Sequence, residues 1–224
     1  MRFNATIIAL LLACNAMCQL KLPDNKLYKS GVVSLNLASA NSGGSGFIIG
    51  ATEDSIYIIT ARHVVLRAKE HALQITANIG DGNKLPVNIL YMKDASDNQL
   101  DDIALCSAPL KKVHVGSYCS VSGAEPDTEV FFFRSEAQKE RIPVVENGTI
   151  ESWEDENNRM FSIYLVGISP CDSGSALFSN DGIVGMIIKE QSSYGYALSI
   201  DHIKDVITSW NKKYWQLCSK PYNP

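Results

Sequence analysis

Short apolar segments rich in β-branched residues recur along the whole of this 224-residue chain. Clusters of Gly, Ser, Asp and Asn separate them, among them Ser42–Ser45, Asp81–Asn83 and Asp94–Asn98. This alternation is typical of β-strands joined by turns and predicts an all-β barrel or sandwich. The predicted strands are Gly31–Leu37, Gly46–Gly50, Ser55–Thr60, Leu73–Ile79, Val87–Met92, Asp102–Cys106, Glu129–Phe133, Gly148–Ser152, Met160–Val166, Ala176–Phe178, Ile183–Ile188 and Tyr196–Ile200.

About twelve strands fit two small barrels packed together. We place the first barrel at about 31–112, the second at about 128–200 and their junction near Val113–Asp127. One helix is predicted after them, at about 201–212, with Asp201 as its N-cap. Its apolar residues fall on one face, as expected for a helix that packs on a core; they are Ile203, Val206, Ile207 and Trp210.

The first 18 residues have the features of an export signal. Arg2 supplies a positive start, and Ala5–Ala13 is an apolar run too short to span a bilayer. Two processing sites compete. Cleavage before Gln19 follows small residues in the right places, whereas Leu11–Cys14 resembles a bacterial lipobox in which Cys14 is lipidated. Both predict an exported protein, periplasmic or secreted, and the second predicts an envelope lipoprotein. Residues 19–30 form a polar lead-in.

Composition excludes several other classes. The net charge of −4 argues against general attraction to nucleic acid. Nothing after residue 20 is apolar enough over sufficient length to span a membrane. No Cys or His spacing indicates a metal site, and no cofactor is predicted. Four cysteines follow the signal segment, and both disulfides and free thiols remain open for them; they are Cys106, Cys119, Cys171 and Cys218.

One turn carries the strongest chemical signal. Asp172-Ser173-Gly174-Ser175 precedes an apolar strand, an arrangement that presents a serine hydroxyl beside backbone N–H groups. Upstream, His63 follows the apolar run Tyr57–Ala61, and Asp102 directly precedes Ile103-Ala104-Leu105. His, Asp and Ser in that order are the chain order of the chymotrypsin-type triad.

The chain resembles the chymotrypsin-like (trypsin-like) serine peptidase superfamily, in particular its bacterial Deg-type and glutamyl-endopeptidase-like branches. The resemblance runs from about residue 31 to residue 210 and implies two packed six-stranded antiparallel barrels with a C-terminal helix. No peptide-binding PDZ module is expected after the helix, and we expect a monomer. The segments that carry the resemblance are Gly44–Ile49, Ile59–Val65, Asp102–Leu105, Asp172–Ser175, Gly182–Ile187 and Tyr196–Asp201.

The resemblance implies a role for each residue of the triad. Ser173 would attack a peptide bond of a polypeptide substrate, and His63 would take its proton and later protonate the leaving amine. Asp102 would hold the imidazole in one tautomer. Its neighbour Asp101 is a rival for this role, but Asp102 directly precedes the strand, where the family places its acid.

The resemblance places the oxyanion hole at the backbone N–H groups of Cys171 and Ser173. Most relatives have glycine in place of Cys171, and glycine tolerates backbone angles that a residue with a Cβ resists. Relatives also often have a small polar residue in place of Ile188 that supports the acid. These two departures leave open an alternative function, a catalytically inactive pseudoprotease that binds peptides or proteins in the same cleft.

The substrate pocket is expected between two segments. Neither supplies an obvious buried acid, so we favour a small or apolar residue before the scissile bond, with Lys189 solvated on the rim. The chain also lacks an Ile-Val-Gly-Gly segment whose release would give Asp172 an amine partner, so we expect maturation without activation cleavage. The pocket residues are Gly167, Ile168, Ser169, Pro170, Ile188, Lys189 and Glu190.

Overall fold

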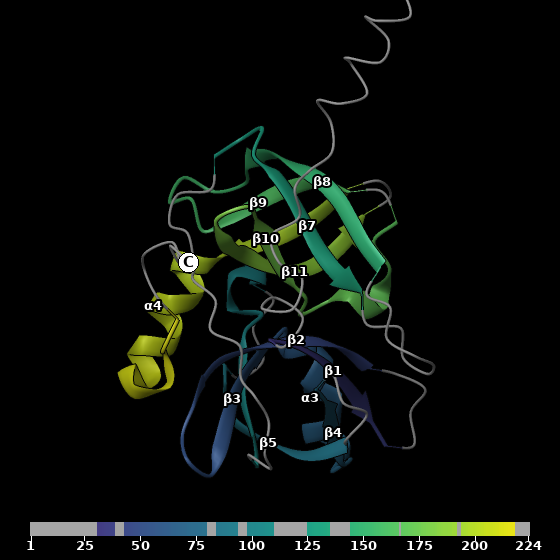
Figure 1. The fold of residues 1–224 in the computed structure, drawn as a ribbon, viewed down its shortest axis with the longest axis vertical. Coiled ribbons are helices and arrows are strands. Elements are labelled where there is room, and N and C mark those ends of the chain that lie inside the picture. The colour runs from purple at the N-terminus through teal and green to yellow at the C-terminus, as the bar shows by residue number, and fades with distance from the viewer. Residues whose placement is uncertain are drawn as a thin grey trace, which may run out of the picture.

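The computed structural model describes residues 31–38, 43–79, 84–93, 98–109, 125–134, 144–165, 167–191 and 194–217. The predicted signal segment, the lead-in and most of the predicted junction lie outside these ranges. The described strands form two closed barrels of six strands each, one above the other in Figure 1. This arrangement confirms the predicted all-β fold.

The first barrel is built from β1 to β6, in the spatial order β1-β2-β3-β6-β5-β4. All of its described pairings are antiparallel. The strands are β1 (Val32–Leu37), β2 (Gly43–Ala51), β3 (Ser55–Thr60), β4 (Ile75–Asn78), β5 (Lys84–Met92) and β6 (Ala104–Pro109).

The second barrel repeats the design in the order β10-β11-β12-β9-β8-β7. Its pairings are antiparallel as well. The strands are β7 (Glu129–Arg134), β8 (Val144–Trp153), β9 (Met160–Leu165), β10 (Ala176–Ser179), β11 (Gly182–Gln191) and β12 (Tyr194–Ser199).

Strand β7 shows how the two barrels join. Successive residues of a strand point to opposite faces. Phe132 belongs to a core cluster made up of residues of the second barrel. Phe131 and Phe133 belong to the larger cluster, which also contains Phe47 and Ile58 of the first barrel. Apolar packing therefore continues from one barrel into the other.

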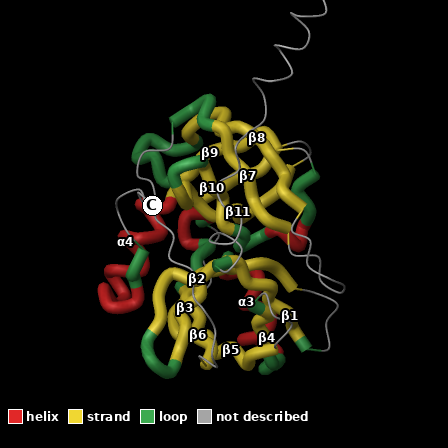
Figure 2. Tube along the Cα trace, viewed as in Figure 1, coloured by secondary structure: helices red, strands yellow, loops and turns green. Residues whose placement is uncertain are grey.

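A helix that the sequence analysis did not predict carries His63. The helix α3 (Arg62–His71) begins directly after β3 and buries Val64, Val65 and Ala68. It ends at Ala72, which adopts the left-handed conformation with φ 52°. The sequence analysis ended its strand at Thr60 and did not use the apolar spacing of i, i+1 and i+4 that the next residues show. In Figure 2 this helix (red) is seen against the strands of the first barrel (yellow).

The predicted C-terminal helix is present as α4 (Ile200–Asn211), one residue earlier than expected. Its N-cap is Ser199, whose hydroxyl accepts a hydrogen bond from the His202 N–H, whereas Asp201 lies in the first turn. Three short 3-10 turns complete the described elements: η1 (Gln99–Asp101), η2 (Pro170–Asp172) and η3 (Lys212–Tyr214). Within the described ranges, no helix is long and apolar enough to cross a membrane.

Candidate active site

The topology of the first barrel brings His63 and Asp102 to one place. Strands β3 and β6 are antiparallel neighbours, and Thr60 at the end of β3 pairs with Ala104 at the start of β6. The residues just after β3 and just before β6 therefore meet at the same end of the pair. His63 follows Thr60 by three residues, and Asp102 precedes Ala104 by two.

Two hydrogen bonds join these residues. His63 Nδ1 lies 2.7 Å from Asp102 Oδ2, and the His63 backbone N–H donates to Asp102 Oδ1 over 2.9 Å. The second bond serves a further purpose, since Ala61 at the N-cap of α3 has no side chain that can accept from the first turn. The Asp102 carboxylate thus caps the helix and orients the imidazole. Its side chain is 14% exposed, against 46% for His63.

Ser173 lies in a turn that is fastened to both barrels. Its carbonyl accepts a hydrogen bond of 2.9 Å from the Ser45 N–H of β2. The next residue, Gly174, donates its N–H over 2.7 Å to the Ile187 carbonyl of β11. Gly174 has φ +87°, and a Cβ there would overlap the Ser45 carbonyl and lie 2.6 Å from Thr60 Oγ1. Only glycine fits this position, because it combines a positive φ with close approach.

Gly44 marks the place where the serine turn meets the helix of His63. A Cβ on Gly44 would lie 2.7 Å from Val64 Cγ2 and 2.9 Å from the Ser173 carbonyl oxygen. Val64, the neighbour of His63, and Ser173 therefore flank the same backbone position of β2. The structure therefore brings Ser173 and the helix that carries His63 to the junction of the two barrels, and there His63 binds Asp102.

Residues 44–186 match the family model of the trypsin-like peptidase domain. The chain belongs to this family. Among solved structures, this peptidase domain is similar to the crystal structure of the Rv3671c protease in an inactive form, with a TM-score of 0.62. The two are 14% identical, and the match covers 82% of this chain and 90% of the other. At that identity the likeness shows the fold alone. No curated protein matches the sequence.

The peptidase domain has an arginine beside the serine turn that the sequence analysis missed. Arg134, the last residue of β7, forms an ion pair of 2.9 Å with Asp172. Its side chain is 23% exposed and that of Asp172 only 2%. The Arg134 guanidinium also donates to the Gly167 carbonyl. Nothing in the sequence singles out Arg134, because it lies 38 residues from its partner at the end of an apolar strand.

The second partner of Asp172 is the residue three positions before it. The Ser169 N–H and hydroxyl both donate to Asp172 Oδ2, at 2.7 and 3.0 Å. In return, the Asp172 N–H donates over 2.9 Å to the Ser169 carbonyl. The Ser169 and Asp172 side chains also form a capping box with each other's backbone N–H groups at the start of η2. They fix the backbone on both sides of Cys171.

The two predicted oxyanion donors alternate with N–H groups that are already bonded. The N–H groups of Asp172, Gly174 and Ser175 each donate to a backbone carbonyl. Cys171 precedes Asp172 in the turn, and Ser173 lies between Asp172 and Gly174. The 3-10 geometry of η2 aims the Pro170 carbonyl toward Ser173, three residues further on.

Cys171 is an exposed free thiol. Cys106 in β6 is also free, but it is buried. The other two candidates for disulfide pairing, Cys119 and Cys218, lie outside the described residues, so pairings that involve only them are not addressed by the structure. Neither Cys106 nor Cys171 forms a disulfide in the structure.

The predicted pocket residues lie in two neighbouring segments, the loop that leads into η2 and the end of β11. Ile168 packs against β12, because a Cβ on Gly195 would overlap its Cδ1 atom. The Ser169 hydroxyl donates its hydrogen bond to Asp172. Lys189 is exposed, with Nζ 5.8 Å from the centroid of the Tyr196 ring. The remaining positions are Gly167, with φ 94°, the exposed Pro170 and Glu190, and the buried Ile188.

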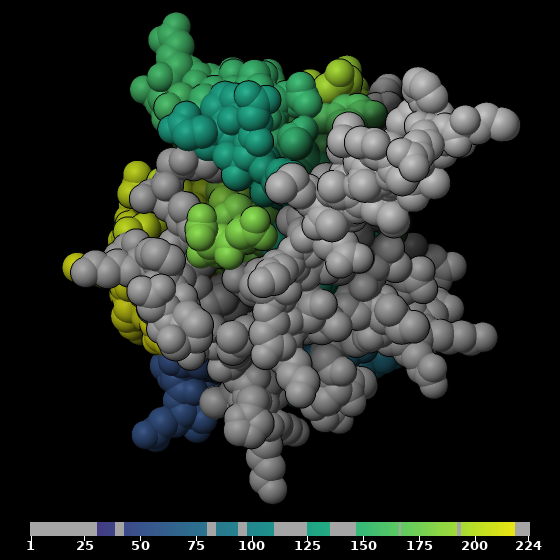
Figure 3. All heavy atoms as spheres, turned by 45° about the horizontal axis from the view of Figure 1, so that its top comes forward, coloured from purple at the N-terminus to yellow at the C-terminus, as the bar shows by residue number. Residues whose placement is uncertain are grey.

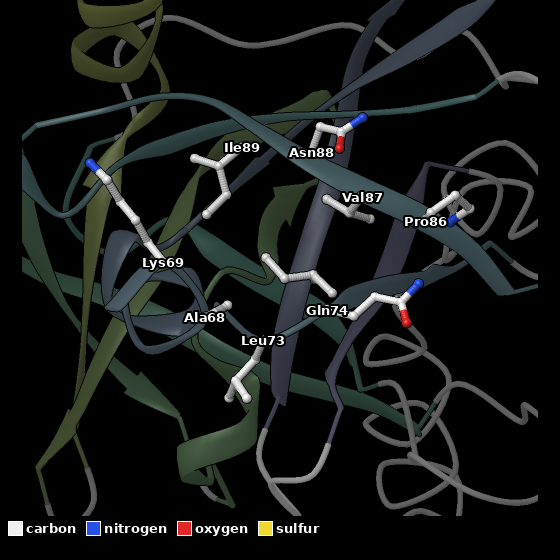
Figure 4. A pocket seen from close by; sticks show the side chains of 9 residues that line it. Ala68, Lys69, Leu73, Gln74, Pro86, Val87, Asn88 and Ile89 are labelled. Carbon is white, nitrogen blue, oxygen red and sulfur yellow. The ribbon is translucent and has the colours of Figure 1, made fainter. Parts of the chain in front are cut away.

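A separate cavity of about 400 Å³ lies at the other end of α3. Figure 4 shows Ala68 and Lys69 of α3 on one side of it and Val87 and Ile89 of β5 on another. None of the predicted site residues lines this cavity. It is therefore distinct from the junction that holds Ser173.

Proposed function

We propose that this protein is a serine endopeptidase that hydrolyses polypeptides through Ser173, His63 and Asp102. The observation that carries the proposal is the two-point contact between His63 and Asp102. A carboxylate that accepts both the ring N–H and the backbone N–H of one histidine fixes the ring in position and tautomer. A histidine with only a structural role does not require this arrangement.

The contact determines the direction of proton transfer. Because Nδ1 donates to Asp102, the neutral ring has its lone pair on Nε2. Nε2 would take the proton from the Ser173 hydroxyl as its oxygen attacks the scissile carbonyl carbon. The same proton would then pass from Nε2 to the leaving amine as the C–N bond breaks. Water would repeat the two steps on the acyl-enzyme and release the second product.

The oxyanion of each tetrahedral intermediate would be stabilised by the N–H groups of Cys171 and Ser173. Asp172, between them, is held by Arg134 and Ser169. For Cys171 to donate, the Pro170–Cys171 peptide has to rotate, since in η2 its carbonyl is aimed toward Ser173. We propose that binding of the substrate drives this rotation.

The same turn supports a second candidate function. A domain whose Pro170 carbonyl stays in the oxyanion position would bind a peptide without cutting it. Cys171 favours that state, because its Cβ restricts the backbone more than glycine does. Ile188 also favours the inactive alternative, since its apolar side chain offers the acid no hydrogen bond.

Labelling with a fluorophosphonate probe separates the two functions. Purified protein should form a covalent adduct at Ser173, and the variants Ser173→Ala and His63→Ala should not. Mass mapping of the labelled peptide identifies the site, and hydrolysis of an unstructured protein then tests endopeptidase activity. Folded protein that binds peptides but neither reacts with the probe nor cleaves would be the inactive binding module.

We further propose that the protein is exported, on the basis of residues 1–18 alone. The mature N-terminus, determined by mass spectrometry of protein from its native host, distinguishes the two processing routes. A start at Gln19 indicates signal-peptide cleavage, and a start at lipidated Cys14 indicates a lipoprotein. A chain that retains Met1 would contradict the proposal.

A further inference from the structure

A hydrogen bond crosses from the C-terminal helix to the loop that carries Asp102. Nε2 of His202 lies 2.9 Å from the Leu100 carbonyl oxygen, and the two residues are 102 positions apart in the chain. Since a carbonyl only accepts, Nε2 carries the proton in this contact. His202 belongs to α4, which follows the second barrel, whereas Leu100 belongs to η1 of the first.

The Leu100 carbonyl lies in the turn that sets the position of Asp102. Asp102 is the C-cap of η1, and its N–H donates over 3.1 Å to the Gln99 carbonyl. At the start of this turn the Asn98 side chain accepts from the Leu100 N–H over 3.1 Å. Asp101 forms an ion pair with Lys93, the residue after β5. His202 therefore fixes a three-residue turn whose next residue is the candidate acid.

The backbone of this turn matters because the Asp102 carboxylate has little other support. Both of its oxygens bind His63, one through the ring and one through the backbone. Ile188 is buried, and its apolar side chain has no group that could hydrogen-bond to a carboxylate. The orientation of the carboxylate therefore depends on where η1 places the Asp102 backbone.

His202 is itself held in a rigid position. It lies in the first turn of α4, and its N–H is bound by the cap residue Ser199. The next residue, Ile203, is fully buried in the core cluster shared by the two barrels. Further along, Trp210 stacks on Tyr91 of β5, with ring centroids 5.6 Å apart. In Figure 3 the yellow atoms of this helix lie between green atoms of the second barrel and blue atoms of the first.

We propose that His202 is a positioning residue for Asp102. It fixes the position of this acid, which belongs to the first barrel, relative to the second barrel, which supplies Ser173. The proposal rests on the proposed function, since Asp102 has this role only in a working triad. His202 does not touch substrate. It acts through the Leu100 carbonyl, and its effect should appear in the rate of the chemical step and not in binding.

The test compares His202→Ala with His202→Gln, whose side-chain amide can still donate to Leu100. The readouts are kinact and KI of the fluorophosphonate probe, which separate reaction from binding. His202→Ala should lower kinact by about 10- to 100-fold, the cost of a small misplacement of catalytic groups, and leave KI unchanged. His202→Gln should recover most of the loss. A matched control is Asp205→Asn, an exposed position one turn further along α4 that should leave both constants unchanged.

A second readout is independent of activity. The proton on His63 Nδ1, in its hydrogen bond to Asp102, should give a low-field proton NMR resonance that shifts or broadens in His202→Ala and returns in His202→Gln. Unchanged kinact and resonance in His202→Ala would overturn the proposal. A loss that glutamine does not restore would also overturn it, because the role would then be packing. If the wild-type protein fails to react with the probe, the proposed function fails, and the resonance alone decides the role of His202.

Discussion

The guanidinium of Arg134 binds the buried carboxylate of Asp172 directly beside Ser173, with Nη2 2.9 Å from Oδ2. Arg134 Nε donates two further hydrogen bonds, one to each carboxylate oxygen, so the contact is bidentate. An arginine is suited to this site because its planar fork matches a carboxylate and its charge is permanent. The chain thus has its own cation for the turn, and we expect that Asp172 does not require a newly released N-terminal amine.

Removal of this cation should inactivate the protein. In Arg134→Met the buried Asp172 charge is left without its partner, a loss that costs about 3–5 kcal/mol for buried pairs. We expect the rate of fluorophosphonate labelling to fall by more than about 100-fold, the contribution of one oxyanion donor, as the turn rearranges. Arg134→Lys keeps the charge without the fork and should retain part of the rate. Full labelling of a folded Arg134→Met protein would show that Asp172 needs no cation.

The same contact predicts independence from N-terminal processing. A protein that begins a few residues before or after Gln19 should react with the probe at the same rate, within about twofold, since Arg134 already occupies the place beside Asp172. Rates measured on a series of such N-termini check this. A rate that rises sharply at one N-terminus would mean that a free amine activates the site.

Replacement of Cys171 by glycine should make the protein more reactive. Glycine lowers the cost of rotating the Pro170–Cys171 peptide out of the 3-10 turn, so that its N–H can face the oxyanion. We expect kinact to rise on the order of tenfold, a part of the contribution of one oxyanion donor. Cys171→Ala is the matched control, because it removes the thiol but keeps the Cβ and should give no such gain. Equal gains in both variants would assign the effect to the thiol.

The two barrels could be predicted from the sequence, and the candidate triad could be proposed from it, because each depends on local pattern. Alternating apolar segments predict strands, and the short segments around His63, Asp102 and Ser173 keep their order along the chain. Contacts between distant residues have no such pattern. Arg134 and His202 lie 38 and 102 positions from their partners, so neither contact could be read from spacing. The helix at His63 was missed because its β-branched residues favour a strand when tertiary packing is ignored.

An acidic loop of the second barrel offers a test of pH-dependent stability. In the turn between β8 and β9, burial opposes ionisation of Asp155. The hydrogen bonds from the Arg159 side chain and from the Arg159 and Met160 N–H groups outweigh it and lower its pKa from 3.8. A lowered pKa in the folded state means that the stabilisation is present above the unfolded value and is lost as pH falls through the folded one.

Asp155→Asn should therefore lower the free energy of unfolding by about 1–2 kcal/mol at pH 7, in the range for hydrogen bonds to a charged group. The deficit should shrink as the pH falls below 3.8, the ordinary pKa. Urea unfolding at several pH values measures it. Glu156→Gln, at the exposed neighbouring position, is the control and should show no deficit. A deficit that is the same at every pH would assign the loss to packing.

The two described thiols should differ sharply in reactivity. Burial raises the pKa of Cys106 to about 12, so in the folded protein it stays protonated and out of reach of reagents at pH 8. Cys171 is exposed beside Ser173. Iodoacetamide should modify Cys171 and leave Cys106 intact until the protein is denatured, as peptide mass mapping can show. Alkylation should also abolish fluorophosphonate labelling, since the added group lies beside the nucleophile. In Cys171→Ala the same treatment should leave labelling unchanged; a loss there would trace the inhibition to another cysteine.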